Sequence, residues 1–164
     1  MKNMKNIMKI SGLLVLVLPL IGCQVDDLND DQVLEGDSVT YTVIHSANSK
    51  TNGELGSKTF KVLKSQAEYF DELANYSTDA TKTIDFDHAQ VILLDIGQRN
   101  SGGYSVEISD INEFDDYIKV EVNIQSPGNG CITTQALTNP YKFIELQGTK
   151  EITINESLVS IDCE

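Results

Sequence analysis

The sequence predicts an α+β fold, a single domain made mostly of antiparallel β-sheet with one long helix. Three observations support this prediction. Several segments alternate apolar and polar residues, one segment has helical spacing, and the later strands are joined by short connections that contain Gly, Asn or Asp. The predicted order is two strands, one helix and then five strands, and this order is typical of α+β domains.

Two strands and the helix are predicted in the first half of the domain. Residues 39–43 alternate apolar and polar, and residues 59–63 form a second short strand candidate. Between them, residues 46–57 are rich in Ser, Asn, Gly and Lys, which favours an exposed loop. Residues 65–68 have the spacing of a helix capping box, and apolar residues follow at helical intervals, so we expect a helix over residues 66–76.

Five strands are predicted in the second half. Residues 91–94 are continuously apolar, as expected of a strand that is covered on both faces. Alternation predicts three more strands over residues 104–109, 118–125 and 141–146, of which 118–125 has the clearest pattern, and residues 151–155 are expected to form the last strand.

The first 23 residues have the pattern of a secretory signal. Residues 1–9 carry three lysines and no acid, and residues 10–21 are a short, mainly apolar run. The ending Leu-Ile-Gly-Cys resembles a bacterial lipobox, which implies removal of residues 1–22 and lipidation of Cys23. The alternatives are a plain secretory peptide or one membrane helix, although the apolar run is short against the roughly 20 residues of a span.

Residues 23–36 are acidic and lack aromatic residues, so we expect a flexible tether that leads to the folded domain at residues 37–164. The acids after Cys23 resemble signals that direct some lipoproteins to the outer leaflet of the outer membrane, and a solvated spacer is the alternative. We therefore expect a cell-envelope protein, lipid-anchored in the outer membrane, that faces the periplasm or the surface.

The net charge excludes one class of partner. The chain has 12 basic and 25 acidic residues, a formal net charge of −13, and loss of the leader with its three lysines would make it −16. Such a charge repels phosphate backbones, so nucleic acid is not expected as a partner. Because anionic lipid is repelled too, the acyl chains on Cys23 have to supply the membrane affinity.

Two cysteines remain after the lipidation site, Cys131 and Cys163. Outside the cytoplasm such thiols tend to oxidise, so we expect a disulfide between them, and two buried free thiols are the alternative. Closing this loop would stabilise the fold by roughly 3.7 kcal/mol in the chain-entropy model.

Three polar loops, at residues 97–104, 126–131 and 133–141, resemble the C-terminal domain of the protease complex subunit PrcB family. The residues that match the family pattern are Gly97, Gly102, Gly103, Tyr104, Pro127, Gly128, Thr134, Gln135, Thr138, Pro140 and Tyr141. The resemblance covers roughly residues 85–146. One departure precedes the paired glycines, where members often have Pro-Thr and this chain has Asn100-Ser101.

The family's namesake associates with a surface serine protease and stabilises it. The resemblance therefore implies a non-enzymatic accessory module, without catalytic residues or cofactor, that binds an envelope or surface protein such as a protease. The residues expected to contact that partner are Gly97, Arg99, Gly102, Gly103, Tyr104, Pro127, Gly128, Gln135, Thr138, Pro140 and Tyr141.

Single residues in these loops allow plainer interpretations. Residues 97–104 could form a tight hairpin connection with no partner rather than a recognition loop. Arg99 is the only arginine, and its guanidinium could hold a partner's carboxylate or a neighbouring Asp.

No metal site is expected from the acidic and histidine residues. Residues 85–88 contain two acids and a histidine that diverge on a strand, and the Asp115-Asp116 turn with Glu113 would at best bind calcium weakly. His45 stands alone and is expected at the surface.

Two alternative functions come from other classes. Residues 100–104, 127–130 and 139–141 are similar to the three inhibitory loops of chagasin-like cysteine protease inhibitors. Those inhibitors are immunoglobulin-like sandwiches without a long helix, which conflicts with the helix predicted here. A small extracytoplasmic hydrolase is the third possibility, although neither histidine lies in a recognisable catalytic motif.

Overall fold

The computed structural model describes residues 36–52, 56–78 and 82–163. Residues Leu34–Glu164 form one compact unit. The predicted leader at 1–22, including its apolar run, and nearly all of the predicted tether with Cys23 lie outside the described residues. Within the described ranges, no helix has the length and apolar character needed to cross a membrane.

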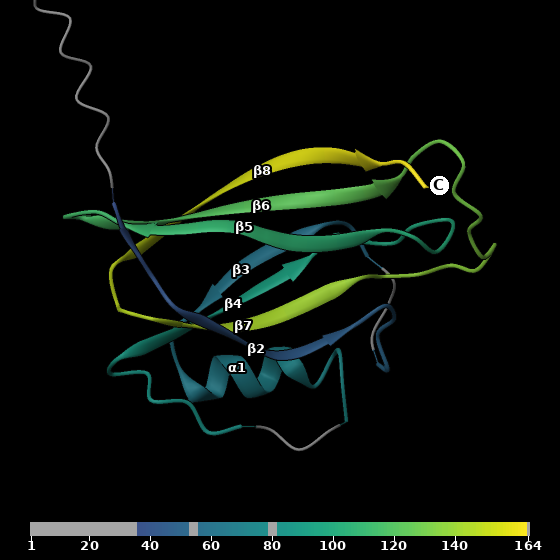
Figure 1. Ribbon diagram of the computed structural model, residues 1–164. Coiled ribbons are helices and arrows are strands. Elements are labelled where there is room, and N and C mark those ends of the chain that lie inside the picture. Colours follow the sequence, from purple (N-terminus) through teal and green to yellow (C-terminus); the bar gives the residue numbers. More distant parts are fainter. Residues whose placement is uncertain (1–35, 53–55, 79–81, 164) are drawn as a thin grey trace, which may run out of the picture. The chain divides into compact units, whose positions relative to one another are not determined.

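The described part of the chain contains eight strands and one helix (Figure 1). In order they are β1 (Asp37–Ser38), β2 (Tyr41–Ala47), β3 (Thr59–Leu63), α1 (Gln66–Leu73), β4 (Ala89–Asp95), β5 (Ser105–Glu113), β6 (Tyr117–Pro127), β7 (Tyr141–Gln147) and β8 (Glu151–Ile161).

The strands form two four-stranded sheets. One has the order β1-β5-β6-β8 and the other β2-β7-β4-β3. All pairings are antiparallel except that of β6 with β8, which run parallel along eleven residue pairs. The sheets are therefore mostly antiparallel, as predicted. The parallel pair arises because β7, which lies between β6 and β8 in the sequence, belongs to the other sheet.

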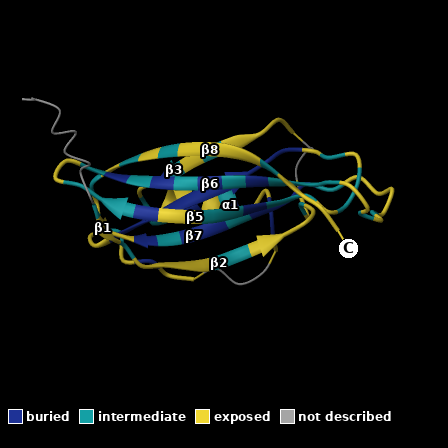
Figure 2. Ribbon diagram, turned by 45° about the horizontal axis from the view of Figure 1, so that its top comes forward, coloured by how far each residue is buried: buried dark blue, intermediate teal, exposed yellow. Residues whose placement is uncertain are grey.

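The two sheets pack face to face around one apolar core. The strongest alternation in the sequence supplies its centre, since Ile118, Val120, Val122 and Ile124 of β6 are all buried. Ile92 and Leu94 of β4 and Ile144 and Leu146 of β7 meet them from the other sheet. Figure 2 shows β6 and β7 largely buried or intermediate, whereas β8 and β2 at the sheet edges are mainly exposed.

The helix α1 covers the outer face of the second sheet (Figure 1). Its Tyr69 and Leu73 pack against Val91 and Leu93 of β4 and against Phe143 of β7. Every residue of β4 is therefore buried, with the first sheet on one face and the helix on the other. This confirms the expectation drawn from the continuous apolar run.

The predicted long helix is wrong, and with it the α+β fold class. The domain is mostly β, a two-sheet sandwich, and α1 has 8 residues rather than extending to residue 76. The start is as predicted, because the Ser65 side chain accepts a hydrogen bond from the Glu68 N–H. After Leu73, the N–H groups of Asn75 and Tyr76 bond to carbonyls three residues back, which tightens and ends the helix.

The alternation in residues 39–43 correctly indicates a strand, but the apolar side chains at positions 41 and 43 are not buried. Tyr41 and Val43 are 41% and 44% exposed, although both lie on the side of β2 that faces the other sheet. The edge opposite β2 carries only the two residues of β1, so these side chains stay uncovered. A bulge between Val43 and His45 turns Ile44 toward the core beneath α1.

Candidate binding site at the loop end

Three loops and the C-terminus meet at one end of the sandwich. Strand β4 ends there at Asp95, β6 at Pro127 and β8 at Ile161, and β7 begins there at Tyr141 (Figure 1). Residues 97–104, 126–140 and 161–163 therefore lie together, and they are called the loop end below. The three polar loops singled out in the sequence all belong to it.

The first and third loops are hydrogen-bonded to each other. Arg99 and Thr138 exchange both backbone hydrogen bonds, with N···O distances of 2.8 and 3.0 Å. The Gly102 N–H donates to the Thr134 carbonyl at 3.0 Å, and the Thr138 hydroxyl donates to the Ser101 carbonyl at 2.9 Å. The glycine-rich loop is therefore a paired ribbon rather than an isolated hairpin.

Gly103 shows why a glycine is needed in this ribbon. Its φ is +86°, a left-handed conformation that side chains disfavour. A Cβ there would lie 3.1 Å from the Thr133 Cγ2 and 3.2 Å from the Pro127 Cβ. The glycine thus lets all three loops approach one another.

Arg99 is held by its own chain. Its Nη2 donates to the Ile96 carbonyl at 2.7 Å, and its guanidinium carbon lies 5.4 Å from the centre of the Tyr104 ring. No carboxylate among the described residues is within ion-pair distance of it, so the expected pairing with a neighbouring Asp is not formed. Its buried Nε has no hydrogen-bond partner.

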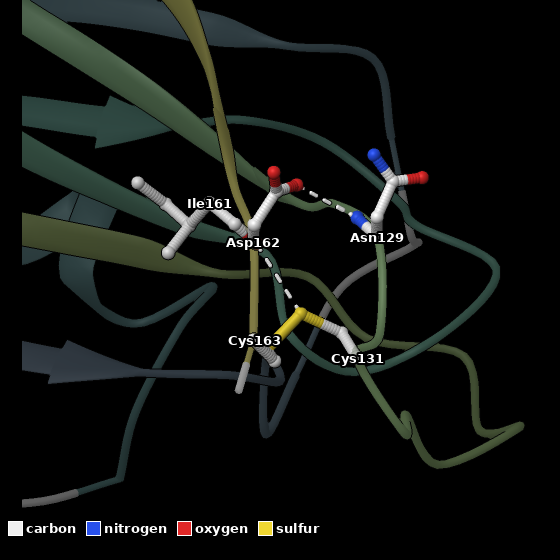
Figure 3. The surroundings of a disulfide bond; sticks show 5 residues. All are labelled: Asn129, Cys131, Ile161, Asp162 and Cys163. Carbon is white, nitrogen blue, oxygen red and sulfur yellow. Dashed lines mark hydrogen bonds between the residues drawn. A yellow bond between two sulfur atoms is a disulfide. The ribbon is translucent and has the colours of Figure 1, made fainter.

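The second loop is fixed to the C-terminus (Figure 3). The Cys131 and Cys163 sulfurs lie 1.97 Å apart as a disulfide, the predicted pair. Next to it, the Asn129 N–H donates to the Asp162 carboxylate at 2.8 Å, and the Cys163 N–H donates to the Asn129 carbonyl at 3.0 Å. The Gly128 N–H donates to the Ile161 carbonyl at 2.8 Å, so the turn follows the end of β8 closely.

A buried carboxylate lies at the base of the loop end. Asp95 is 0% exposed and accepts hydrogen bonds from the Gly97 N–H, the Asn139 Nδ2 and the Tyr76 hydroxyl at 2.6 to 2.7 Å. The Lys50 ammonium pairs with it at 2.9 Å. Burial, and next the hydrogen bond to Asp95, raise the pKa of the Tyr76 phenol far above its usual range. This network, the Asp95 cluster, joins four chain segments.

The tip of the loop end carries exposed apolar side chains. Ile132 is 101% exposed, Leu137 is 59% exposed and Ile161 is 45% exposed. An open pocket of about 180 Å³ lies between Gly103, Pro127, Ile132 and Ile161, with the disulfide at its wall. Exposed apolar groups on a fixed frame are typical of a protein-binding surface.

The predicted contact residues divide between the surface and the interior. Gln135 and Gly103 are exposed, and half-buried positions are Arg99, Gly102, Tyr104, Pro127, Gly128 and Thr138. Gly97, Pro140 and Tyr141 are buried, and the Tyr141 hydroxyl donates to the Tyr76 carbonyl at 3.1 Å. These three residues shape the loop end and do not reach its surface.

Sequence reasoning missed the apolar tip and the Asp95 cluster. Ile132 and Leu137 are single apolar residues in polar loops, and no periodic pattern singles them out. Asp95 directly follows the apolar run of residues 91–94 within β4, and this position was a usable indication of a buried acid. Lys50 lies in a loop that was expected to be exposed, yet its side chain is only 10% exposed.

The candidate metal residues do not converge. Among the described residues, no three His, Cys, Asp or Glu side chains are placed to share an ion. His88 pairs with Asp85 at 2.9 Å on the surface, which lowers the Asp85 carboxyl pKa. Glu113 pairs with Lys150 at 2.7 Å. His45 is half-buried and contacts the Tyr141 hydroxyl, so the expectation of a surface histidine is wrong.

The family model described as PrcB C-terminal matches residues 91–147. The match confirms the resemblance predicted from the three loops, and it runs from Val91 within β4 to the end of β7. Strand β8, with Cys163 beyond it, and helix α1 lie outside the matched segment. No curated protein and no solved structure matches the chain.

Proposed function

We propose that this chain is a non-enzymatic accessory module of the cell envelope that binds a protein partner through the loop end. The exposed Ile132 and Leu137 side chains carry the proposal, because they project from a segment that is fixed at both ends. The disulfide fixes the start of this segment at Cys131, and the backbone bridge between Arg99 and Thr138 fixes its end. A surface ordered before binding loses little conformational entropy on association.

The PrcB match and the net charge narrow the partner class. A protease of the envelope or surface is the partner that the PrcB resemblance favours. The net charge of −13 favours a partner whose contact surface is neutral or basic. Lipid attachment through Cys23 would hold the domain at the outer membrane, where such a partner can be reached by diffusion along the surface.

The sandwich fold favours the protease-inhibitor alternative, but the burial of its third loop argues against it. The two-sheet sandwich removes the conflict posed by the predicted long helix. However, Asn139 is 0% exposed and Tyr141 is 2% exposed, so the third of the three loops cannot enter a protease cleft. A hydrolase gains no support from the histidines, because His45 contacts Tyr141 and His88 pairs with Asp85.

In-cell photo-crosslinking tests the proposal. A photoreactive residue placed at position 132 or 137 should form an adduct with one specific envelope protein. The same photoreactive residue at position 43 is the control, because Val43 is an exposed apolar residue, 44% accessible, on the edge strand β2 outside the loop end. Equal adducts from positions 43 and 132, or none from 132 and 137, would contradict docking through the loop end.

A further inference from the structure

The Asp95 cluster contains the three groups needed to form an amide bond between side chains. The Lys50 Nζ lies 2.9 Å from the Asp95 Oδ2, and the Asn139 Nδ2 lies 2.6 Å from the Asp95 Oδ1. One carboxylate thus contacts an amine with one oxygen and a carboxamide with the other. We propose that Lys50 and Asn139 become joined by an isopeptide bond, with Asp95 as the acid–base group.

These three groups are largely shielded from solvent. Asp95 and Asn139 are 0% exposed, and the Lys50 side chain is 10% exposed. The Lys50 Nζ lies 4.4 Å from the centre of the Tyr76 ring, and the Tyr141 ring packs against Tyr76 at 4.7 Å. The nucleophilic form of Lys50 is the neutral amine, which forms when the ammonium gives a proton to the Asp95 carboxylate that it contacts.

The backbone fixes the two reacting residues next to each other. The Asn139 N–H donates to the Asn48 carbonyl at 2.7 Å, two residues before Lys50. On the other side of Lys50, the Thr51 N–H donates to the Tyr76 carbonyl at 3.0 Å. Such fixation replaces a bimolecular encounter with an intramolecular one, which accelerates amide formation strongly.

The Asn139 side chain is also unusual in its hydrogen bonding. Its Oδ1 is buried and has no hydrogen-bond partner. A buried orphan acceptor normally has a reason. Here a protonated Asp95 would donate to that oxygen after rotation of the amide and so polarise the carbon that the amine attacks.

The step balances without a further reactant. Asp95 removes a proton from the Lys50 ammonium, the Nζ–Cγ bond to Asn139 forms, and the Cγ–Nδ2 bond breaks. Of the three ammonium protons, one stays on the new amide and two leave with Nδ2 as ammonium, relayed by Asp95. No atom is oxidised or reduced. The product would join the β2–β3 connection covalently to the start of β7.

Peptide mapping by mass spectrometry of the full-length protein tests the linkage. A reduced tryptic digest should contain one branched peptide that joins the segments around residues 50 and 139, lighter by one ammonia than their sum. Trypsin should not cleave after Lys50, because an acylated lysine is not a substrate. Recovery of separate peptides with an unmodified Lys50 and Asn139 from the wild-type protein would overturn the proposal.

Three variants distinguish the chemistry. Lys50→Arg and Asp95→Asn should both abolish the branched peptide, the second because amine and carboxamide remain but the proton relay is lost. Lys58→Arg is the matched control, since Lys58 pairs with Glu156 on the surface, and it should leave the branched peptide unchanged. A branched peptide that persists in Asp95→Asn would remove Asp95 from the mechanism. The wild-type map decides the linkage itself, even where a variant fails to fold.

Discussion

At the residue scale, buried polar contacts organise the loop end more than the residues of the family pattern do. Asp95 receives three hydrogen-bond donors and the Lys50 ammonium from four segments that are far apart in the sequence. No periodicity encodes such a cluster, because each member is a single polar residue in its own loop or strand end. Gly97 and Gly103 belong to a loop that the sequence singled out, and both occupy positive φ, a conformation that glycine adopts without strain.

Removing the Tyr76 hydroxyl should destabilise the fold. Tyr76→Phe takes one donor from a fully buried carboxylate, and we expect the free energy of unfolding to fall by about 1.5–3 kcal/mol. Denaturant unfolding near neutral pH measures this loss. Tyr104→Phe is the control, because that ring is half-buried and its hydroxyl is not bonded to Asp95. Equal effects of the two substitutions would contradict the role given to Tyr76.

The raised pKa of Tyr76 also predicts how the stability of the fold changes with pH in alkaline solution. The folded state raises the Tyr76 pKa, chiefly by burial, so the stabilisation is complete below the ordinary tyrosine pKa of about 10. Above it the unfolded chain loses a proton that folded Tyr76 retains, and stability falls as the pH rises. In Tyr76→Phe the decline above about pH 10 should be shallower. An identical alkaline decline in both proteins would contradict the assignment.

At the element scale, long periodic patterns were predictable and their ends were not. The alternation in β6 and the apolar run of β4 identified both core strands. The helix was predicted to end too late, because Tyr76 continues the apolar spacing although its hydroxyl binds Asp95. Strand β8 extends to Ile161, beyond the predicted residue 155, since its exposed second half follows β6 by backbone pairing. The alternation of apolar and polar side chains does not indicate backbone pairing of this kind.

The disulfide should stabilise the second loop and the end of β8 together. Replacing both Cys131 and Cys163 by serine should lower the free energy of unfolding by roughly 3.7 kcal/mol in the chain-entropy model. Denaturant unfolding of the oxidised wild type and the double variant measures the difference. Cys23→Ser serves as the control, because it removes a cysteine outside the bonded pair. A loss below about 1 kcal/mol would show that the remaining hydrogen bonds hold this turn without the bond.

At the scale of the whole molecule, a two-sheet sandwich presents its loop end, and the proposed lipid anchor at Cys23 would hold this domain at the membrane. The sequence predicted one folded domain and the region of the site, because the three polar loops stood out by composition. It did not predict two facing sheets, since the pairing partner of each strand depends on contacts between distant segments. Nor did it predict which loop residues face outward, since that depends on how the loops bond to one another.

The anchor is tested by metabolic labelling. Labelled palmitate should be incorporated into the wild-type protein, and the protein should fractionate with membranes. Cys23→Ser should lose the label and enter the soluble fraction, because a lone domain of net negative charge has little affinity for anionic lipid. Unlabelled wild-type protein would contradict lipidation at Cys23.

The most direct test of docking through the loop end is the affinity for the protein that crosslinks at position 132. The wild type, an Ile132→Ser/Leu137→Ser variant and the Val43→Thr control should be titrated with that purified partner. We expect the double variant to raise the Kd by about 30-fold or more, since about 2 kcal/mol is typical of an apolar hot spot. Val43→Thr should bind as the wild type does. An unchanged Kd in the folded double variant would contradict docking through the loop end.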